Sequence, residues 1–571
     1  MFFLRDLISN DINSLQIMKN TILIGLIIVF IYVIVLKALE LFRNNEKLSY
    51  NEVVTVKTIN EINKKSVLYI TILIIWLVQC LSGLTSLIIN ISFYEHISLS
   101  FGKIILLIVN VTFISYFWLN GIKDLVYSFF YRLKNYAKIE KEILEFKIPT
   151  DVSNSKIVAL YCTCDDFIEE SLLKSMNQNY RNFRVVILDD SNNVGYKKRI
   201  DIFSSKYDIE VIRRSDRKGF KAGNLNNYLK DRTDYDYFII LDSDEIIPTD
   251  FCENSLKYFF YYENIGIVQA NHISTRDRTK FMDRFSLGVN SHWPTYQGIK
   301  NEYGFMSFLG HGALISRECF QSVKSFPELV SEDLCFSIEA RLKGYYVAFA
   351  QGIICEEEYP IDYFAFKKRH LKWTGGNLEF IKKYSSKLFK SSTLKWFEKL
   401  DVVLFTFSLP MSSAFFLFLT INLIIFSILH MSAGYPLWLM VPTVICLFAP
   451  IINDMVYVWG KYPLLKSIGY LFSSFLLYGS LYWISFYGAT KAWFGVKAKF
   501  IVTPKENKSY TLLDTLRGNF QEVCFSGSLI FISVYFTHSL LPVILIVFPS
   551  LSGMYLTHLS KPKKTKSFSH R

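Results

Sequence analysis

The chain has 571 residues, of which 51% are hydrophobic and 16% aromatic, and its 63 Lys and Arg against 50 Asp and Glu give a formal charge of +13. Its apolar residues gather in runs long enough to cross a bilayer, which excludes an ordinary soluble protein. A basic balance alone signals only non-specific attraction, so we expect no nucleic-acid partner and attribute the charge to Lys and Arg clustered beside the apolar runs.

The first 122 residues are predicted to hold about three transmembrane helices, in the runs Ile22–Leu36, Val67–Ile91 and Ile104–Leu119. The first run is too late and too long to be a cleaved signal peptide. Lys and Arg are frequent in Lys37–Lys65 and absent from Phe93–Phe101, which predicts that the first connection is inside and the second outside. The amino terminus is then outside, and the long region Lys123–Lys399 is cytoplasmic.

Residues 150–385 are predicted to form an α/β domain. From about Lys156 onwards, short apolar runs alternate with amphipathic stretches, which is typical of βαβ units and a mainly parallel sheet. Four runs are predicted as its first strands: Ile157–Tyr161, Phe183–Leu188, Glu210–Arg213 and Tyr237–Leu241. Polar, mostly acidic residues follow several of them and would meet at one edge of the sheet. Solvated turns explain any one of these acidic ends, but they explain the set poorly.

The strand Tyr237–Leu241 ends at Asp242-Ser243-Asp244. Ligands of open α/β sheets bind at the carboxyl ends of the strands, and two carboxylates there suit a Mg²⁺ or Mn²⁺ ion that carries a diphosphate. The triplet is weak evidence by itself, because D-x-D arises easily by chance. A second triplet, Asp234-Tyr235-Asp236, lies just upstream with no strand before it. The nine cysteines have no paired metal-ligand spacing, so we expect reduced thiols and no zinc site.

Three motifs in order resemble family 2 glycosyltransferases of the GT-A fold. They are Asp189-Asp190 after the second strand, the K-A-G-N-x-N turn at Lys221–Asn226, and Asp242-Ser243-Asp244. The resemblance implies a Rossmann-like GT-A catalytic domain, inserted here into an α-helical transmembrane domain.

Three further motifs resemble the processive membrane branch of that family, which includes cellulose, chitin and hyaluronan synthases. Ser331-Glu332-Asp333 matches T-E-D with serine for threonine, Arg369–Trp373 stands where the branch has Q-x-x-R-W, and Phe500–Lys505 fits F-x-V-T-x-K, a gating-loop motif. The resemblance extends from about residue 156 to 510.

For the donor, the resemblance implies that Asp244 ligates Mg²⁺ or Mn²⁺ and that Asp242 supports it or contacts the ribose. Asp189 and Asp190 would contact the uridine, and Thr163 would line the uracil pocket.

Four more residues complete the implied donor site. Lys221 would approach the nucleotide from its turn, although a solvated turn lysine is the alternative. Lys372 would pair with the diphosphate at the position where the family usually has arginine. Lysine there keeps the positive charge but loses the bidentate geometry of a guanidinium. Thr503 and Lys505 of the gating-loop motif would also contact the substrate.

For the acceptor, an inverting transfer needs a carboxylate to take the proton of the attacking hydroxyl, and the motif position implies Asp333. Its neighbour Glu332 is expected to hold local structure. The alternative is that Ser331 caps a helix at Leu334–Leu342. Trp373 would stack on the terminal sugar, unless it is a buried core residue. His311 aligns with a family segment near the acceptor and would contact the substrate there, but a structural role is at least as strongly expected for it.

Residues 386–460 are predicted to form an interfacial helix at Leu388–Leu400 and two spans, Val402–Leu429 and Leu437–Val458. Within residues 465–510, the stretch Ile468–Phe494 is apolar enough to cross the membrane. If it crossed, the lysine-rich loop that follows it would lie outside the cell. We therefore predict an interfacial or re-entrant helix and then the gating loop. Residues 520–560 are predicted to form the last spans, and 561–571 a basic cytoplasmic tail. About seven spans are expected in all.

These features together predict a processive, inverting glycosyltransferase that polymerises a β-linked polysaccharide from a UDP-sugar and exports it. UDP-glucose is the expected donor, and a UDP-hexosamine or UDP-uronic acid is the alternative. Transfer of a single sugar to a lipid or glycan, and a non-catalytic transporter or signalling protein, are rival hypotheses. We expect a bacterial-type plasma (inner) membrane with the catalytic domain in the cytoplasm, and accessory export subunits or a homo-oligomer as further partners.

Overall fold

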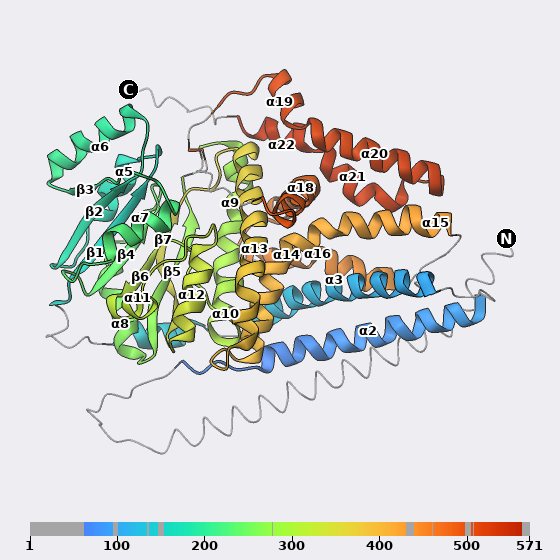
Figure 1. The fold of residues 1–571 in the computed structure, drawn as a ribbon, viewed down its shortest axis with the longest axis horizontal. Helices are drawn as coiled ribbons and strands as arrows, with labels where there is room; N and C mark the ends of the chain where they lie inside the picture. Colours follow the sequence, from blue (N-terminus) through green and yellow to red (C-terminus); the bar gives the residue numbers. More distant parts are fainter. Residues whose placement is uncertain are drawn as a thin grey trace, which may run out of the picture. The chain divides into compact units, whose positions relative to one another are not determined.

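The computed structural model describes residues 62–94, 101–133, 136–146, 154–276, 278–429, 439–459, 461–496, 504–505 and 508–561 (Figure 1). Their contacts divide the chain into two compact units. One contains the described residues of 66–132 and 418–453, and the other contains those of 59–65, 133–417 and 454–571. The predicted first span Ile22–Leu36, most of the two connections used for topology, Thr503 and the tail after residue 561 lie outside the described residues.

The first unit is built from helices. It contains α2 (Val67–Tyr94), nearly all of α3 (Phe101–Leu133), and most of α16 (Met440–Val458). The indole N–H of Trp118 on α3 donates to the Thr443 hydroxyl on α16 at 2.9 Å. At Gly121 an added Cβ would lie only 2.4 Å from the Cβ of Cys446, so the small residue allows α3 and α16 to pack closely.

Six helices among the described residues are long and apolar enough to cross a membrane: Val67–Thr85, Phe101–Leu133, Met440–Val458, Leu464–Trp493, Phe520–Thr537 and Leu541–Leu559. The predicted crossing Val402–Leu429 is not among the six. It is divided between α14 (Trp396–Thr420), the π-helix η3 (Ile421–Ile425) and α15 (Phe426–Ile428). The stretch Ile468–Phe494 falls in α17 (Leu464–Gly479) and α18 (Tyr482–Trp493). In Figure 1, α18 is seen nearly end-on, whereas α20 (Phe520–Thr537) and α21 (Ile544–Leu551) run across the view. The interfacial placement of this stretch stays a prediction.

The second unit contains a seven-stranded sheet in the order β3-β2-β1-β4-β6-β5-β7. The strands are β1 (Ile157–Thr163), β2 (Phe183–Asp189), β3 (Glu210–Ile212), β4 (Tyr237–Leu241), β5 (Ile265–Ser274), β6 (Ala313–Ser316) and β7 (Tyr346–Glu357). All pairs are parallel except those of β6, which is antiparallel to β4 and β5. The four strands predicted from the sequence are present, and the sheet is mixed, of the GT-A type.

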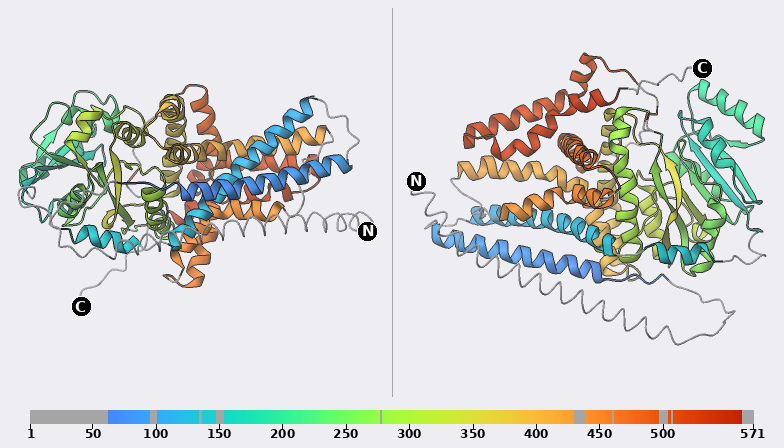
Figure 2. Two further views of the ribbon diagram at one scale, coloured as in Figure 1. Left: turned by 90° about the horizontal axis from the view of Figure 1, so that it is seen from below. Right: turned by 180° about the vertical axis from the view of Figure 1, so that it is seen from behind.

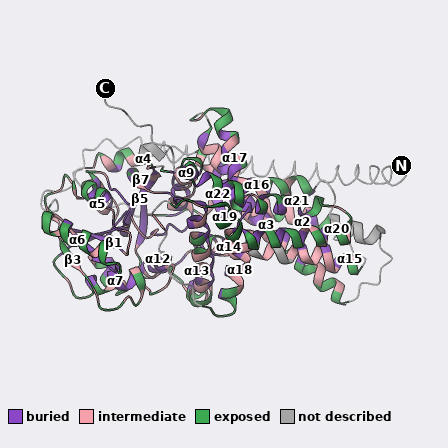
Figure 3. Cartoon of the chain, turned by 90° about the horizontal axis from the view of Figure 1, so that it is seen from above, coloured by how far each residue is buried: buried purple, intermediate pink, exposed green. Residues whose placement is uncertain are grey.

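Both faces of the sheet are buried, which explains why its strands are continuous apolar runs. Alternate residues of β1 and β4 enter two clusters: Ala159 and Ile239 pack on one face, whereas Leu160 and Ile240 pack on the other. The first cluster includes side chains of α5 (Glu169–Met176), α6 (Val194–Tyr207) and α8 (Phe251–Tyr261). The second includes those of α7 (Phe220–Leu229), α11 (Arg317–Val323) and α12 (Glu332–Leu342). Figure 2 shows this sheet from two further sides, and Figure 3 shows its strand residues mostly as buried.

The remaining elements of this unit are helical: α4 (Tyr136–Leu144), α9 (Lys280–His292), η2 (Trp293–Gln297), α10 (Gly298–Tyr303), α13 (Tyr363–Lys390), α19 (Leu512–Gly518), η5 (Leu541–Val543) and α22 (Gly553–Leu559). The predicted helix Leu388–Leu400 is not continuous, because it is split between the end of α13 and the start of α14. The Ser391 hydroxyl accepts the backbone N–H groups of Thr393 and Leu394, each at 3.2 Å, which forms a turn instead.

Candidate active site

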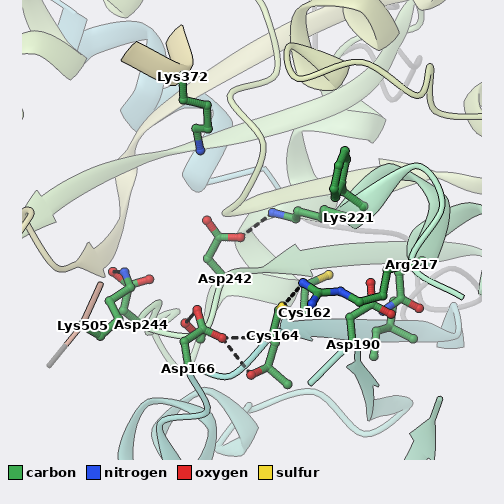
Figure 4. Close-up of a pocket in the computed structure, with 15 residues that line it drawn as sticks. Cys162, Cys164, Asp166, Asp190, Arg217, Lys221, Asp242, Asp244, Lys372 and Lys505 are labelled. Carbon is green, nitrogen blue, oxygen red and sulfur yellow. Dashed lines mark hydrogen bonds and ion pairs between the residues drawn. The ribbon is translucent and has the colours of Figure 1, made fainter. Parts of the chain in front are cut away.

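A pocket lies at the carboxyl ends of β1, β2 and β4 (Figure 4). Its open space, including the part open to solvent, is about 700 Å³. It is lined by Cys162, Thr163, Cys164, Asp166, Leu188, Asp190, Arg217, Phe220, Lys221, Asn224, Asp242, Ser243, Asp244, Lys372 and Lys505. The structure thus brings together most of the donor-site residues that the sequence predicted, from segments far apart in the chain.

The two carboxylates that follow β4 each face a lysine ammonium. Lys221 donates to Asp242 and to the carbonyl of Gly310, the latter at 2.9 Å. Lys505 lies 2.6 Å from Asp244 Oδ2. Burial favours the neutral form of Asp242, but the Lys221 ammonium more than offsets this and holds the pKa of Asp242 well below its usual range. Both lysines therefore neutralise carboxylates at the mouth of the pocket, rather than pointing freely into solvent.

The donor set fits a divalent cation. Asp242 and Asp244 line the same pocket, and their side chains are 42% and 9% exposed. Two hard carboxylate oxygens are the ligands that Mg²⁺ and Mn²⁺ favour. The ammonium groups of Lys221 and Lys505 already lie where positive charge is required, so a bound ion and these lysines would share the neutralisation of the two carboxylates.

The acidic pair after β2 is held by two arginines that the sequence analysis did not select. Arg213 donates to Asp189 at 2.6 Å, and Arg214 binds both oxygens of Asp190, at 2.8 and 2.6 Å. Asp190 lines the pocket, whereas the side chain of Asp189 is fully buried and also accepts the N–H of Ser191 at 2.8 Å. Asp190 is therefore accessible from the pocket, and Asp189 is not. Two adjacent arginines directly after β3 were the feature of the sequence that could have predicted these ion pairs.

At the end of β1, Thr163 lines the pocket next to an acid that the sequence analysis gave no role. The Thr163 hydroxyl donates to Asp166 at 2.9 Å, and the Ser243 hydroxyl donates to the other oxygen of Asp166 at 2.7 Å. Burial raises the pKa of Asp166. This carboxylate joins the first strand end to the D-x-D segment and fixes their spacing.

The S-E-D motif begins α12. Asp333 accepts the N–H of Leu334 at 2.7 Å, and burial raises the pKa of Asp333. Glu332 is buried, and burial together with the Asp333 charge raises its pKa to about 7. Ser331 occupies the N-cap position, but its side chain makes no cap hydrogen bond. Asp333 does not line this pocket; it faces Gly310, whose carbonyl accepts from Lys221.

The R-H-L-K-W segment lies within α13. Lys372 lines the pocket, and in Figure 4 its ammonium extends toward the space beside Asp242. Burial lowers the pKa of Lys372. Trp373 is 45% exposed, so it is not a buried core residue. His370 is buried and hydrogen bonded to the Ser485 hydroxyl at 2.6 Å, which leaves it no open face for substrate.

Glu245, directly after the D-x-D triplet, is a buried hub that the sequence analysis did not select. It contacts His272 Nε2 at 2.8 Å and His311 Nδ1 at 3.3 Å. Burial alone would lower the pKa of His311, but the Glu245 carboxylate reverses this and raises it to about 10. The ligand atoms of Glu245, His272 and Cys355 lie within 4.8 Å of one another. Each carboxylate oxygen of Glu245 already has a histidine partner, so we interpret the cluster as support for the D-x-D segment and His311 as structural.

Replacing Gly312 with Ala is expected to destabilise this hub. Gly312 has φ +60°, and an added Cβ would lie 2.3 Å from both Glu245 Oε1 and His272 Nε2. Strained backbone and overpacking together are expected to cost about 2 kcal/mol or more of unfolding free energy, measured as a lower thermal midpoint in detergent. Gly344→Ala is the control, because Gly344 has φ +96° with nothing within 4 Å, so it reports the backbone cost alone. Equal losses in the two variants would contradict the role of the hub.

We compared the sequence of the chain with models of known protein families. Residues 237–496, from the D-x-D strand through α18, match the model described as glycosyl transferase family group 2. This part of the chain is therefore similar to family 2 glycosyltransferase domains. That match includes the S-E-D and R-H-L-K-W segments.

Curated relatives are similar over part of the chain. Glucomannan 4-beta-mannosyltransferase 1 of Cyamopsis tetragonoloba is 22% identical over 39% of this chain and 44% of its own length. Probable glucomannan 4-beta-mannosyltransferase 7 of Oryza sativa subsp. japonica is 25% identical over 35% and 36%, respectively. The matched region spans less than half the length of these relatives. A solved mannosyltransferase of Pyrobaculum calidifontis in complex with GDP-Man and Mn²⁺ is 16% identical, covers 66% of this chain and 99% of its own, and has a TM-score of 0.38.

Proposed function

We propose that this protein is an inverting glycosyltransferase that extends a β-linked polysaccharide from a nucleoside-diphosphate hexose. The observation that carries the proposal is the composition of the pocket: Asp242 and Asp244 share it with Lys221, Lys372 and Lys505. Two carboxylates suit a divalent ion, and several cations suit a diphosphate. A donor whose leaving group is a nucleoside diphosphate needs both.

The reaction assigns a task to each side of the site. A divalent ion at Asp244 and Asp242 would supply Lewis-acid stabilisation of the leaving diphosphate. Lys221, Lys372 and Lys505 would hold the charge of that diphosphate, and Asp190 and Thr163 would contact the nucleoside. Asp333 would accept the proton of the acceptor hydroxyl as its oxygen attacks the anomeric carbon from the side opposite the diphosphate, which inverts the configuration.

Processive synthesis and export are part of the proposal. The exposed ring of Trp373 offers a stacking surface that tolerates a sliding sugar chain, and the helices apolar enough to span a membrane supply a route across it. The catalytic domain would then lie on the cytoplasmic side of the plasma membrane, where nucleotide sugars are made.

UDP-glucose is the first donor candidate, because the Phe500–Lys505 motif resembles that of cellulose synthases. A nucleoside-diphosphate mannose is the second, because the curated relatives are named as mannosyltransferases. UDP-hexosamine and UDP-uronic acid complete the set of candidates.

The test is incorporation from radiolabelled UDP-glucose, GDP-mannose, UDP-N-acetylglucosamine and UDP-glucuronate, with the purified full chain and Mn²⁺ or Mg²⁺. High-molecular-weight product from UDP-glucose is the expected result, and the same product from GDP-mannose would select the second candidate. A single sugar on a lipid or short glycan would favour the non-processive rival. No transfer from any donor, despite metal-dependent binding of nucleotide, would contradict the proposed function.

A further inference from the structure

Arg369 occupies the position that the family motif gives to glutamine, one helical turn before Trp373 on α13. Residues four apart lie on the same side of a helix, so Arg369 borders the face that carries Trp373. Compared with the glutamine of the family motif, the arginine adds a permanent positive charge, because a guanidinium stays protonated in proteins.

The guanidinium of Arg369 is surrounded by aromatic rings. Its carbon lies 4.6 Å from the ring centre of Trp373, 5.1 Å from that of Phe366 and 5.2 Å from that of Tyr359. Phe366 in turn packs against Tyr478 with ring centres 6.2 Å apart. Trp373 and Tyr478 are 45% and 51% exposed, whereas Phe366 and Tyr359 are buried. Three rings therefore lie against the cation, and the two exposed rings, Trp373 and Tyr478, leave aromatic surface open beside it.

The contacts of the Arg369 guanidinium are with aromatic rings, and in the described part of the chain it forms no ion pair with an Asp or Glu. Its Nε is buried and makes no hydrogen bond. The nearby carboxylate of Asp454 already accepts hydrogen bonds from Ser291 and Tyr470. Burial lowers the pKa of the neighbouring His370 to about 4, so that side chain is neutral and adds no second positive charge. A buried donor without an acceptor is costly, and a ligand oxygen would relieve that cost.

We propose that Arg369, Trp373 and Tyr478 form an acceptor subsite that binds an acidic sugar unit. The rings would stack on the apolar face of the sugar, and the guanidinium would bind its carboxylate, whose two oxygens match the planar array of N–H donors. This inference rests on the proposed function, because it takes Trp373 to be an acceptor platform. It narrows the acceptor from any β-linked glycan to one that carries a hexuronate near its growing end.

The test compares two ligands that differ only at C6: a β-1,4-linked tetramer of mannuronate and β-1,4-mannotetraose. Each is titrated calorimetrically into the full chain carrying Asp333→Asn, so that no turnover occurs and no donor is needed. We expect the acidic tetramer to bind about tenfold more tightly than the neutral one, the size of a charge-assisted hydrogen bond. Arg369→Gln, which restores the family residue, is expected to abolish that preference while changing the affinity for mannotetraose less than about twofold.

Lys368→Gln is the matched control, because it removes the same charge from the exposed neighbouring position of α13 and should keep the preference. Arg369→Lys, which keeps the charge but not the planar donors, should retain part of it. Equal affinities for the two tetramers, a preference that survives Arg369→Gln, or no binding of the acidic tetramer at millimolar concentration would each overturn the inference. These outcomes are separate from a failure of the proposed function, which appears as absent transfer from every nucleotide sugar.

Discussion

Replacing Asp333 with Asn is expected to lower kcat by about 10²- to 10⁴-fold, the usual contribution of a positioned general base, while nucleotide binding is retained. Asp333 lies in the first turn of α12 and does not line the proposed donor pocket, so its loss is expected to leave the contacts to the nucleotide in place. Its neighbour Gly310 accepts from Lys221, which puts the carboxylate next to the donor site. Radiolabel incorporation measured beside equilibrium binding of UDP separates the two effects.

The pH profile gives a second readout for the same residue. Burial raises the pKa of Asp333 above its ordinary value of 3.8. A base must be deprotonated to accept a proton, so kcat/KM of the unchanged protein is expected to rise with pH through that raised pKa and to be lost below it. In Asp333→Asn this acid limb should disappear from the residual activity.

Glu332→Gln is the companion variant, because Glu332 is the adjacent carboxylate and its pKa is raised to about 7. We expect it to retain more activity than Asp333→Asn. If Glu332→Gln were inactive and Asp333→Asn active, the general base would be Glu332 and not Asp333.

Replacing Asp244 with Asn is expected to remove high-affinity Mn²⁺ binding and to lower the transfer rate about a thousandfold, because metal stabilisation of a leaving diphosphate is worth several kcal/mol. The substitution keeps the side-chain volume but removes the charge that faces Lys505 at 2.6 Å. The direct measurement is the loss of the free Mn²⁺ electron paramagnetic resonance signal as protein is added with UDP, which does not depend on turnover.

The upstream triplet supplies a matched control for that experiment. Asp234 is also the acid of a D-x-D, but it lies on the surface and pairs with Arg184 at 2.5 Å and Arg232 at 3.6 Å. Asp234→Asn is expected to leave both Mn²⁺ binding and transfer unchanged. If Asp244→Asn bound Mn²⁺ as tightly as the unchanged protein, the D-x-D at 242–244 would not be the metal site.

Much of the sheet could be predicted, because strands buried on both faces must be apolar along their whole length and so stand out from their surroundings. The runs at Ile157–Tyr161 and Tyr237–Leu241 are of this kind, and their polar ends marked the edge where the pocket lies. The antiparallel direction of β6 was not predictable in this way, because an apolar run carries no record of which way the chain passes through the sheet.

The sequence by itself selected acids after parallel strands and the lysines Lys221, Lys372 and Lys505, which line one pocket. It predicted a turn around Lys221, whereas Lys221 lies in α7. Only the tertiary structure decided their partners. It paired Lys221 with Asp242 and Lys505 with Asp244, buried Asp189 against Arg213 while Asp190 lined the pocket, and placed Arg369 among aromatic rings. Local sequence sets the periodicity and the ends of each element, but contacts between distant elements depend on how their buried faces pack, and that is a property of the whole domain.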